Sequence, residues 1–261
     1  MKSKFITAVG ITMLSCGILV SNVHPVSAIV NNGSSQSGSQ AATKGNGQIL
    51  TSARTISEFS KINVSSGITV IVTDQLSNVA EVTTDSNIQS HVNIDNINGS
   101  LNIYTKGAIN PSKDIVVRVP YDSDLSGIIA SASSKVNVLS SIYATNFDLK
   151  ISSSAICNID SINTTDSLTI DTQSSGALNI IKTSVAANAT INVSSSGKLN
   201  GEKLSINNAN VKATRSGLAV FTVKEKLNAT ATTSGKIKYF GTPTSSTIKK
   251  MSSGKIVNLN N

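Results

Sequence analysis

The chain has 261 residues, of which only 3 % are aromatic and 14 % charged, and it contains no tryptophan. This length suffices for one sizeable core or two small ones. So few rings exclude a core packed around aromatic side chains, and the interior must instead consist of thin aliphatic layers. Because β-branched residues are abundant, the composition favours strands over helices.

The first 28 residues have the pattern of an export signal. Lys2 and Lys4 supply a short positive region, an apolar run follows over residues 5–20, and the sequence VSA at 26–28 forms a small-residue cleavage site. We therefore predict a signal peptide over residues 1–28 with cleavage after Ala28. The mature protein is expected in the periplasm, on the outer membrane surface or outside the cell.

Two alternatives to this cleavage remain open. A membrane anchor is disfavoured because Ser15 and Ser21 interrupt an apolar run that is short for a span of about 20 residues, so we expect no transmembrane anchor in the mature chain. Lipidation at Cys16, suggested by the sequence MLSC, is less favoured because GILV continues the apolar run past the cysteine. Cleavage would leave Cys157 as the only cysteine, which excludes an intrachain disulfide.

The mature chain divides into a linker and one domain. Residues 29–53 are rich in Gly, Ser, Gln and Asn, which predicts a flexible linker. Residues 54–261 show apolar residues with a period of two and no 3.6-residue stripe, so we predict an all-β domain. Its first part, 54–120, is irregular, and it could form either an antiparallel β cap or the first turns of a repeat; residues 121–261 are regular.

The regular part repeats a Ser-Ser-Gly phrase seven times. The repeated position is occupied by Lys135, Ala155, Gly176, Gly197, Gly217, Gly235 and Gly254, at intervals of 18 to 21 residues. Seven near-equivalent corners predict a single-stranded β-helix (a β-solenoid) with coils of about 20 residues, stacked roughly 4.8 Å apart. A β-sandwich is the alternative, but it predicts alternating hairpins in place of equivalent corners. We expect the corner glycines to adopt positive φ and the corner serine hydroxyls to bond along the stack.

Apolar residues keep a fixed distance from each corner, as a thin core requires. One set lies six residues before it: Ile129, Leu149, Ile170, Ile191, Val211, Ala229 and Ile248. A second lies two residues after it: Cys157, Leu178, Leu199, Ala219, Ile237 and Ile256, with the first copy shifted by one to Val136 and Val138. A third lies between corners: Ile142, Ile162, Val185, Leu204 and Val223.

The sequence offers no catalytic, cofactor-binding or metal-binding set, and we predict a protein that is not an enzyme. A nucleophilic serine needs a base, but His91 is the only candidate in the mature chain and lies in the irregular part. Cys157 occupies a position that holds aliphatic residues in the other repeats, so it is expected to be a small buried core residue. Acids such as Asp148 and Asp171 do not recur in register as the carboxylate pair of a glycosidase would.

The charge is concentrated in the second half of the chain. Residues 29–179 hold 8 basic and 12 acidic residues, whereas residues 180–261 hold 12 basic and 2 acidic ones. Lys198, Lys236 and Lys255 each follow a corner glycine, and with Lys238 they form a candidate polyanion-binding patch. The alternative is that these lysines protect exposed strand edges. Nucleic acid is not an expected partner, because an exported chain rarely meets it and no aromatic residues are interleaved for stacking.

The order of several segments resembles the GIN-domain family, which is named for the head domain of autotransporter adhesins. The segments are RTISEFSKINVSSGITVIVTDQ, INGSLNIYTK, IVVRVPYDSDLSGIIASASSKVNV, the Ser-Gly repeats and a closing SGKIKYFGTP. The resemblance covers about residues 54–261 and implies an exported bacterial β-helix whose function is unknown. It departs from the usual pattern where Lys135 and Ala155 replace glycine.

These observations together predict an exported, adhesin-like interaction module on the cell surface or in the periplasm. Its expected partners are an anionic cell-envelope polymer, a glycan or a host surface. Two alternatives stay open: a polysaccharide-active β-helix enzyme, and a self-assembling structural protein of the envelope.

Overall fold

The computed structural model describes residues 41–75, 77–121 and 125–260. The predicted signal peptide and Cys16 lie outside this part of the chain. Apart from the 3₁₀ helix η1 (Gln89–His91), every regular element is a strand, so the all-β prediction is confirmed. Within the described residues, no helix is long and apolar enough to cross a membrane.

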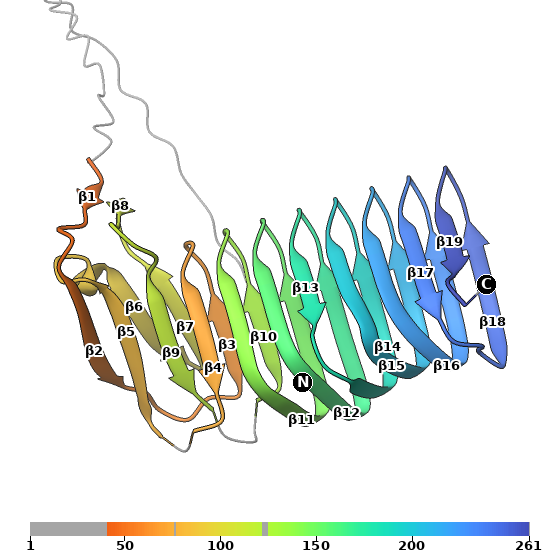
Figure 1. Ribbon diagram of the computed structural model, residues 1–261, viewed down its shortest axis with the longest axis horizontal. Coiled ribbons are helices and arrows are strands. Elements are labelled where there is room, and N and C mark those ends of the chain that lie inside the picture. The colour runs from red at the N-terminus through yellow and green to blue at the C-terminus, as the bar shows by residue number, and fades with distance from the viewer. Residues whose placement is uncertain (1–40, 76, 122–124, 261) are drawn as a thin grey trace, which may run out of the picture. The chain divides into compact units, whose positions relative to one another are not determined.

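Stacked parallel coils form most of residues 40–261 (Figure 1). The chain passes from β10 (Gly127–Ala130) into the long, bent strands β11 (Lys135–Ile151) and β12 (Ile156–Thr172), and each strand pairs in parallel with the next. The remaining strands continue this stack: β13 (Ala177–Ile180), β14 (Ser184–Val193), β15 (Lys198–Ala213), β16 (Leu218–Ala231), β17 (Lys236–Phe240), β18 (Ser245–Lys250) and β19 (Lys255–Asn258). The result is a β-solenoid of about six turns, which confirms the predicted architecture over the sandwich.

The irregular first part combines two parallel layers with an antiparallel cap. β3 (Lys61–Val64) and β4 (Thr69–Thr73) pair in parallel with β10 and β11 on one side, and with β7 (Ser100–Thr105) and β9 (Val116–Pro120) on the other. The outermost strands are antiparallel: β6 (Val92–Ile97) on β7, β5 (Val79–Asp85) on β9, and β2 (Ile49–Thr55) on β5. This region therefore contains both the first parallel turns of the solenoid and an antiparallel cap, which we had given as alternatives.

The predicted linker ends earlier than residue 53. The short strand β1 (Thr43–Lys44) pairs with β8 (Ile109–Asn110), and β2 begins at Ile49. The Asp85 carboxylate binds this segment, because it accepts hydrogen bonds from the Gly47 N–H (2.7 Å) and from the hydroxyl (2.6 Å) and N–H (2.8 Å) of Ser112. An edge strand is stabilised by backbone pairing and needs no apolar pattern. The polar composition of this segment therefore gave no sign of a strand.

The corners are tight turns in which the two residues before the glycine, rather than the glycine, have positive φ. At one corner Ser195 and Ser196 have φ of 49° and 64°, and the Gly197 N–H donates to the Ser194 carbonyl at 2.8 Å, as in a type I′ turn. The same positive-φ pair and closing bond occur at all seven corners. The prediction that the glycine supplies the positive φ is therefore wrong.

Glycine is needed at the corner because the preceding coil is too close for a side chain. A Cβ on Gly197 would lie 2.4 Å from the Thr172 carbonyl oxygen, and Gly176, Gly217, Gly235 and Gly254 meet the equivalent carbonyl at 2.1 to 2.5 Å. Along the stack the corners are joined by backbone bonds such as Ser175 N–H to Ser195 carbonyl at 3.0 Å, and not by the serine hydroxyl ladder we had expected.

Register corrects three of the predicted positions. The first corner is Ser134 and not Lys135, so Val136 pairs directly with Cys157 and the apparent one-residue shift disappears. For the same reason Ile128, fully buried, takes the inward place predicted for Ile129. The other inward residues two positions after a corner are buried as predicted. Ile248, predicted in the core six residues before the last corner, is instead 41 % exposed, because β18 pairs with β16 at the last turn of the stack and all six of its residues are exposed.

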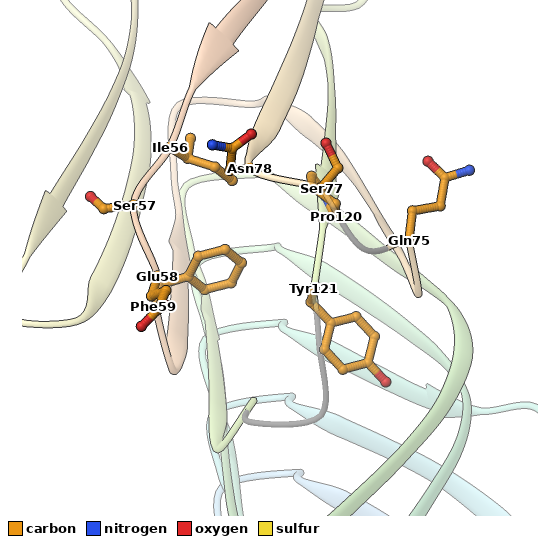
Figure 2. A pocket seen from close by; sticks show the side chains of 9 residues that line it. All are labelled: Ile56, Ser57, Glu58, Phe59, Gln75, Ser77, Asn78, Pro120 and Tyr121. Carbon is orange, nitrogen blue, oxygen red and sulfur yellow. The ribbon is translucent and has the colours of Figure 1, made fainter.

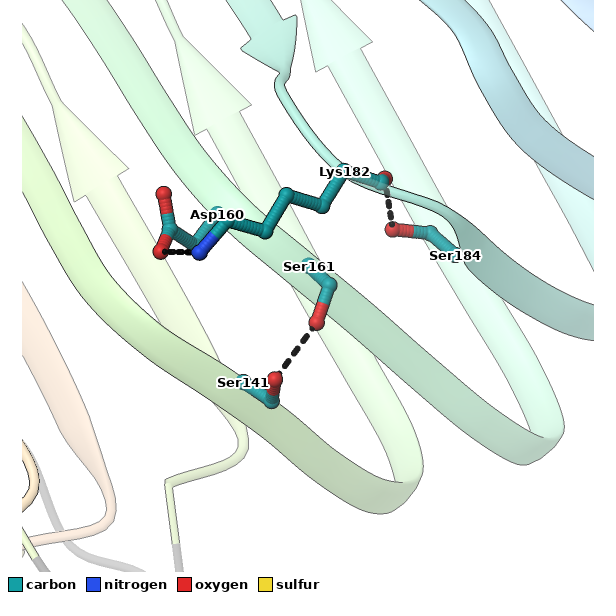
Figure 3. A network of polar contacts seen from close by, with 5 residues as sticks. All are labelled: Ser141, Asp160, Ser161, Lys182 and Ser184. Carbon is teal, nitrogen blue, oxygen red and sulfur yellow. Dashed lines mark hydrogen bonds and ion pairs between the residues drawn. The ribbon is translucent and has the colours of Figure 1, made fainter.

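The third correction concerns the positions between corners, where Val185 is 41 % exposed and Ser184 points inward. The Ser184 hydroxyl replaces an aliphatic contact by accepting from the Ile162 N–H (2.9 Å) and donating to the Lys182 carbonyl (3.1 Å; Figure 3). A buried hydroxyl is tolerated because both of its hydrogen-bonding roles are satisfied.

Candidate functional site

The predicted lysines lie on the outer face of the sheet formed by the strands that follow the corners. Lys198, Leu218, Lys236 and Lys255 are in register on consecutive strands β15, β16, β17 and β19. Neighbouring members of such a column are about 4.8 Å apart. Lys238 lies in the adjacent outward column, between Val220 and Val257. The structure thus brings all four predicted lysines onto one face.

Three of these lysines border a groove with an apolar floor. Lys236, Lys238 and Lys255, together with Leu218, Ile237 and Val257, line a hollow of about 260 Å³. Val257 is 45 % exposed, whereas Ile237 is fully buried. We call this site the lysine groove. Leu218 and Val257 were not among the predicted site residues, although the repeat spacing places both on the outer face.

The outer-face segments that carry these lysines hold no acidic residue. The outer-face segments 198–201, 218–222, 236–240 and 255–258 contain no Asp or Glu. In the part of the chain that the structure describes, the ion pairs are Lys61–Asp148 (3.9 Å) and Lys182–Asp160 (2.7 Å), and neither includes a groove lysine. Cations fixed on a rigid surface without counter-charges produce a positive potential that attracts anions.

In the middle coils, by contrast, one outward column bonds its side-chain amides to one another. The Asn158 side chain donates to Asn137 (2.8 Å) and accepts from Asn179 (2.7 Å), and Asn200 extends this ladder at 2.6 Å. This column is the one that continues with Val220, Lys238 and Val257. The face therefore changes along the axis from bonded amides to free cations.

A second polar network on the middle coils is equally self-contained. Lys182 pairs with Asp160, and the Ser161 hydroxyl donates to the Ser141 hydroxyl at 2.7 Å (Figure 3). Because each charge and hydroxyl in this network already has a partner, the middle coils offer fewer free groups to a ligand than the C-terminal coils do.

The residues considered as catalytic candidates do not form a catalytic group in the described part of the chain. His91 is in η1, and its Nδ1 lies 2.9 Å from the Lys106 carbonyl oxygen. Cys157 is fully buried, and burial raises the pKa of its thiol to about 12, which keeps it protonated. Among the described pairs of in-register strand residues, none joins two acids. The described residues also include no group of three or more His, Cys, Asp or Glu that could hold a metal ion.

A family model confirms the resemblance found in the sequence. The model described as "Putative auto-transporter adhesin, head GIN domain" matches residues 58–243. The chain belongs to this family. A search of curated proteins found no sequence that matches this chain.

Solved structures of similar proteins establish the fold. A "putative adhesin" from Parabacteroides merdae is 23 % identical, with a TM-score of 0.67, covering 84 % of this chain and 99 % of the other. A "putative adhesin" from Parabacteroides distasonis is also 23 % identical, with a TM-score of 0.70, covering 84 % and 100 %. A "putative lipid binding protein" from P. distasonis is 16 % identical, with a TM-score of 0.60, covering 84 % and 99 %.

Proposed function

We propose that the protein is an exported, non-enzymatic interaction module that binds anionic polymers of the cell envelope or of a host surface through the lysine groove and Lys198. The observation that carries this proposal is the placement of Lys198, Lys236, Lys238 and Lys255 on one face, in outer-face segments that contain no Asp or Glu. The adhesin description of the family agrees with a role in surface attachment.

The solenoid suits such a role because it holds the charges in a fixed array. A polymer lying along the axis would meet lysines one or two coils apart, at about 5 to 10 Å. Each contact with an anion is weak, but a rigid scaffold has little conformational entropy to lose when several contacts form together. Binding of this kind releases counterions, and its affinity falls steeply as salt increases.

Charge removal at the four lysines tests the proposal. The chain from residue 29 onward should bind immobilised polyphosphate and heparin, and the variant with Lys198, Lys236, Lys238 and Lys255 changed to Gln should bind at least tenfold more weakly at about 50 mM salt. The matched control changes the exposed residues Lys44, Lys106, Lys113 and Lys150 to Gln, which removes the same charge elsewhere. Equal losses in both variants would show that net charge, and not this face, determines binding.

The apolar floor favours a second candidate, an anionic amphiphile such as a phospholipid. Leu218 and Val257 would contact acyl chain atoms while the lysines contact the phosphate, and one structural neighbour is described as lipid binding. Changing Leu218 and Val257 to Ser separates the candidates: it would weaken binding to phosphatidylglycerol vesicles but not to polyphosphate. If vesicle binding is as strong after this change as before it, the amphiphile is excluded.

A further inference from the structure

Two adjoining hollows lie at the opposite, N-terminal end of the solenoid, where the loops after β2 and β4 meet the end of β9. The first has a volume of about 150 Å³ and is enclosed by residues of these three segments (Figure 2). The second, of about 360 Å³, is lined by Thr73, Val79, Glu81 and Arg118. Gln75, Ser77 and Pro120 line both, so the two hollows adjoin, and we refer to them together as the cleft.

Two aromatic rings border the first hollow in a chain that has only five Phe and four Tyr. Phe59 points toward the middle of the hollow, whereas Tyr121 lines its edge with the ring directed away from the other lining residues, and Tyr121 is only 9 % exposed (Figure 2). The Tyr121 ring is held in place, because its hydroxyl donates to the Ser141 carbonyl (3.0 Å) and its N–H donates to the Thr73 carbonyl (2.9 Å). The partly buried Phe59 ring, packed against the same core, is therefore the aromatic surface open to the C–H face of a sugar, and it loses little side-chain entropy on contact.

The polar side chains around these rings are exposed and have both donors and acceptors. Among the described hydrogen bonds, none uses the side-chain amide of Gln75 or Asn78 or the carboxylate of Glu58. Amides and carboxylates of this kind complement sugar hydroxyls, which also both donate and accept. Glu81 and Arg118 lie directly opposite each other on β5 and β9 and extend the same chemistry into the second hollow.

The composition of the cleft excludes other ligand classes. Two glutamates and one arginine give it no positive excess, so a polyanion would favour the lysine groove. An extended peptide could not add as a strand here, because β5 pairs with β2 and β9, and β9 pairs with β4 and β5. A wholly apolar ligand would leave the amides and carboxylates without partners.

We propose that this cleft binds a sugar ring of an uncharged glycan, with the ring resting on Phe59 and its hydroxyls bonded to Gln75, Asn78 and Glu58. The site is independent of the lysine groove. The protein would then contact a neutral glycan at one end of the solenoid and an anionic polymer at the other.

The test uses the chain from residue 29 onward and a panel of uncharged chito-, cello- and manno-oligosaccharides, measured by saturation-transfer NMR and calorimetry. At least one should bind, with an affinity little changed by salt. Changing Gln75 and Asn78 to Ala should weaken it about tenfold or more, the loss expected for one or two hydrogen bonds. Both residues are exposed, so these changes should leave the fold intact.

Ring variants and the lysine variant complete the design. Phe59→Ala should abolish binding, whereas Tyr121→Phe, which keeps the ring, should retain it. The variant with Lys198, Lys236, Lys238 and Lys255 changed to Gln should bind the sugar as the unchanged protein does. No binding by any member of the panel, or full binding after the Gln75 and Asn78 changes, would overturn the proposal.

Discussion

The corner glycines give the sharpest test of how the solenoid is held together. A Cβ added at Gly197 would lie 2.4 Å from the Thr172 carbonyl oxygen and 2.6 Å from its carbon, and this carbonyl already accepts a hydrogen bond from Ser194 N–H at 2.9 Å. Both groups are backbone atoms of packed coils, so neither can swing aside. The methyl must therefore separate two coils or break their hydrogen bond.

The cost of Gly197→Ala follows from three opposing contributions. Overpacking costs about 1–3 kcal/mol, and weakening the Ser194 bond costs about 0.5–1.5 kcal/mol. The lower entropy of the unfolded alanine chain returns about 0.4–1 kcal/mol. We expect a net loss of about 2–3 kcal/mol, which would lower the urea midpoint by about 1 M.

The assay is equilibrium urea unfolding of the chain from residue 29 onward, followed by far-ultraviolet circular dichroism. Gly67→Ala is the matched control: Gly67 has φ of +67° and nothing within 4 Å of an added Cβ, so only backbone strain of about 1 kcal/mol opposes the change. Ala155 occupies the equivalent corner place one coil before Gly176 and is fully buried there. If Gly197→Ala unfolds at the unchanged midpoint, this corner accepts an alanine as the Ala155 corner does, and the steric explanation of the glycines is wrong.

Two further predictions concern titratable groups. The hydrogen bond from the Ser112 hydroxyl, more than any other cause, lowers the pKa of Asp85. The ionised carboxylate therefore stabilises the fold fully above the ordinary aspartate pKa of 3.8, and this stabilisation is lost as the pH falls through the lowered pKa. Asp85→Asn should make the thermal midpoint less dependent on pH between about pH 2 and pH 5, and an unchanged pH profile would contradict this account. Because burial raises the pKa of the Cys157 thiol to about 12, it should not react with a disulfide reagent near pH 8 until the protein is unfolded in urea, and prompt reaction of the native protein would show that its coil opens readily.

The regular coils were predictable because each one repeats the same solution to the same packing problem. Inward residues such as Leu178 and Leu199 recur at a fixed distance from the glycine, and parallel pairing then fixes their register. The exact place of a corner was less predictable where no glycine marks it. Ser134 fills the first corner with a side chain whose hydroxyl reaches the Val64 carbonyl at 3.3 Å, a contact from a coil 70 residues earlier in the chain.

The N-terminal cap and its cleft could not be predicted for a related reason. β3 lies between β10 and β7, and β4 lies between β11 and β9, so neighbours in space are distant in sequence. The cleft joins residues near positions 58, 78 and 120, and no local pattern signals their approach. The lysine groove, by contrast, follows from the repeat alone, because residues one coil apart become neighbours.

This difference explains how one fold can present two unlike surfaces. Packing against adjacent coils fixes the inward columns and the corners, whereas the outward columns are free to change without loss of the core. Along one such column the bonded amides of Asn158, Asn179 and Asn200 give way to Val220 and Lys238. The position of a binding surface on a solenoid is therefore set by where along the axis the outward residues change. In this chain they change most at the coils that carry the lysine groove and at the cap at the opposite end.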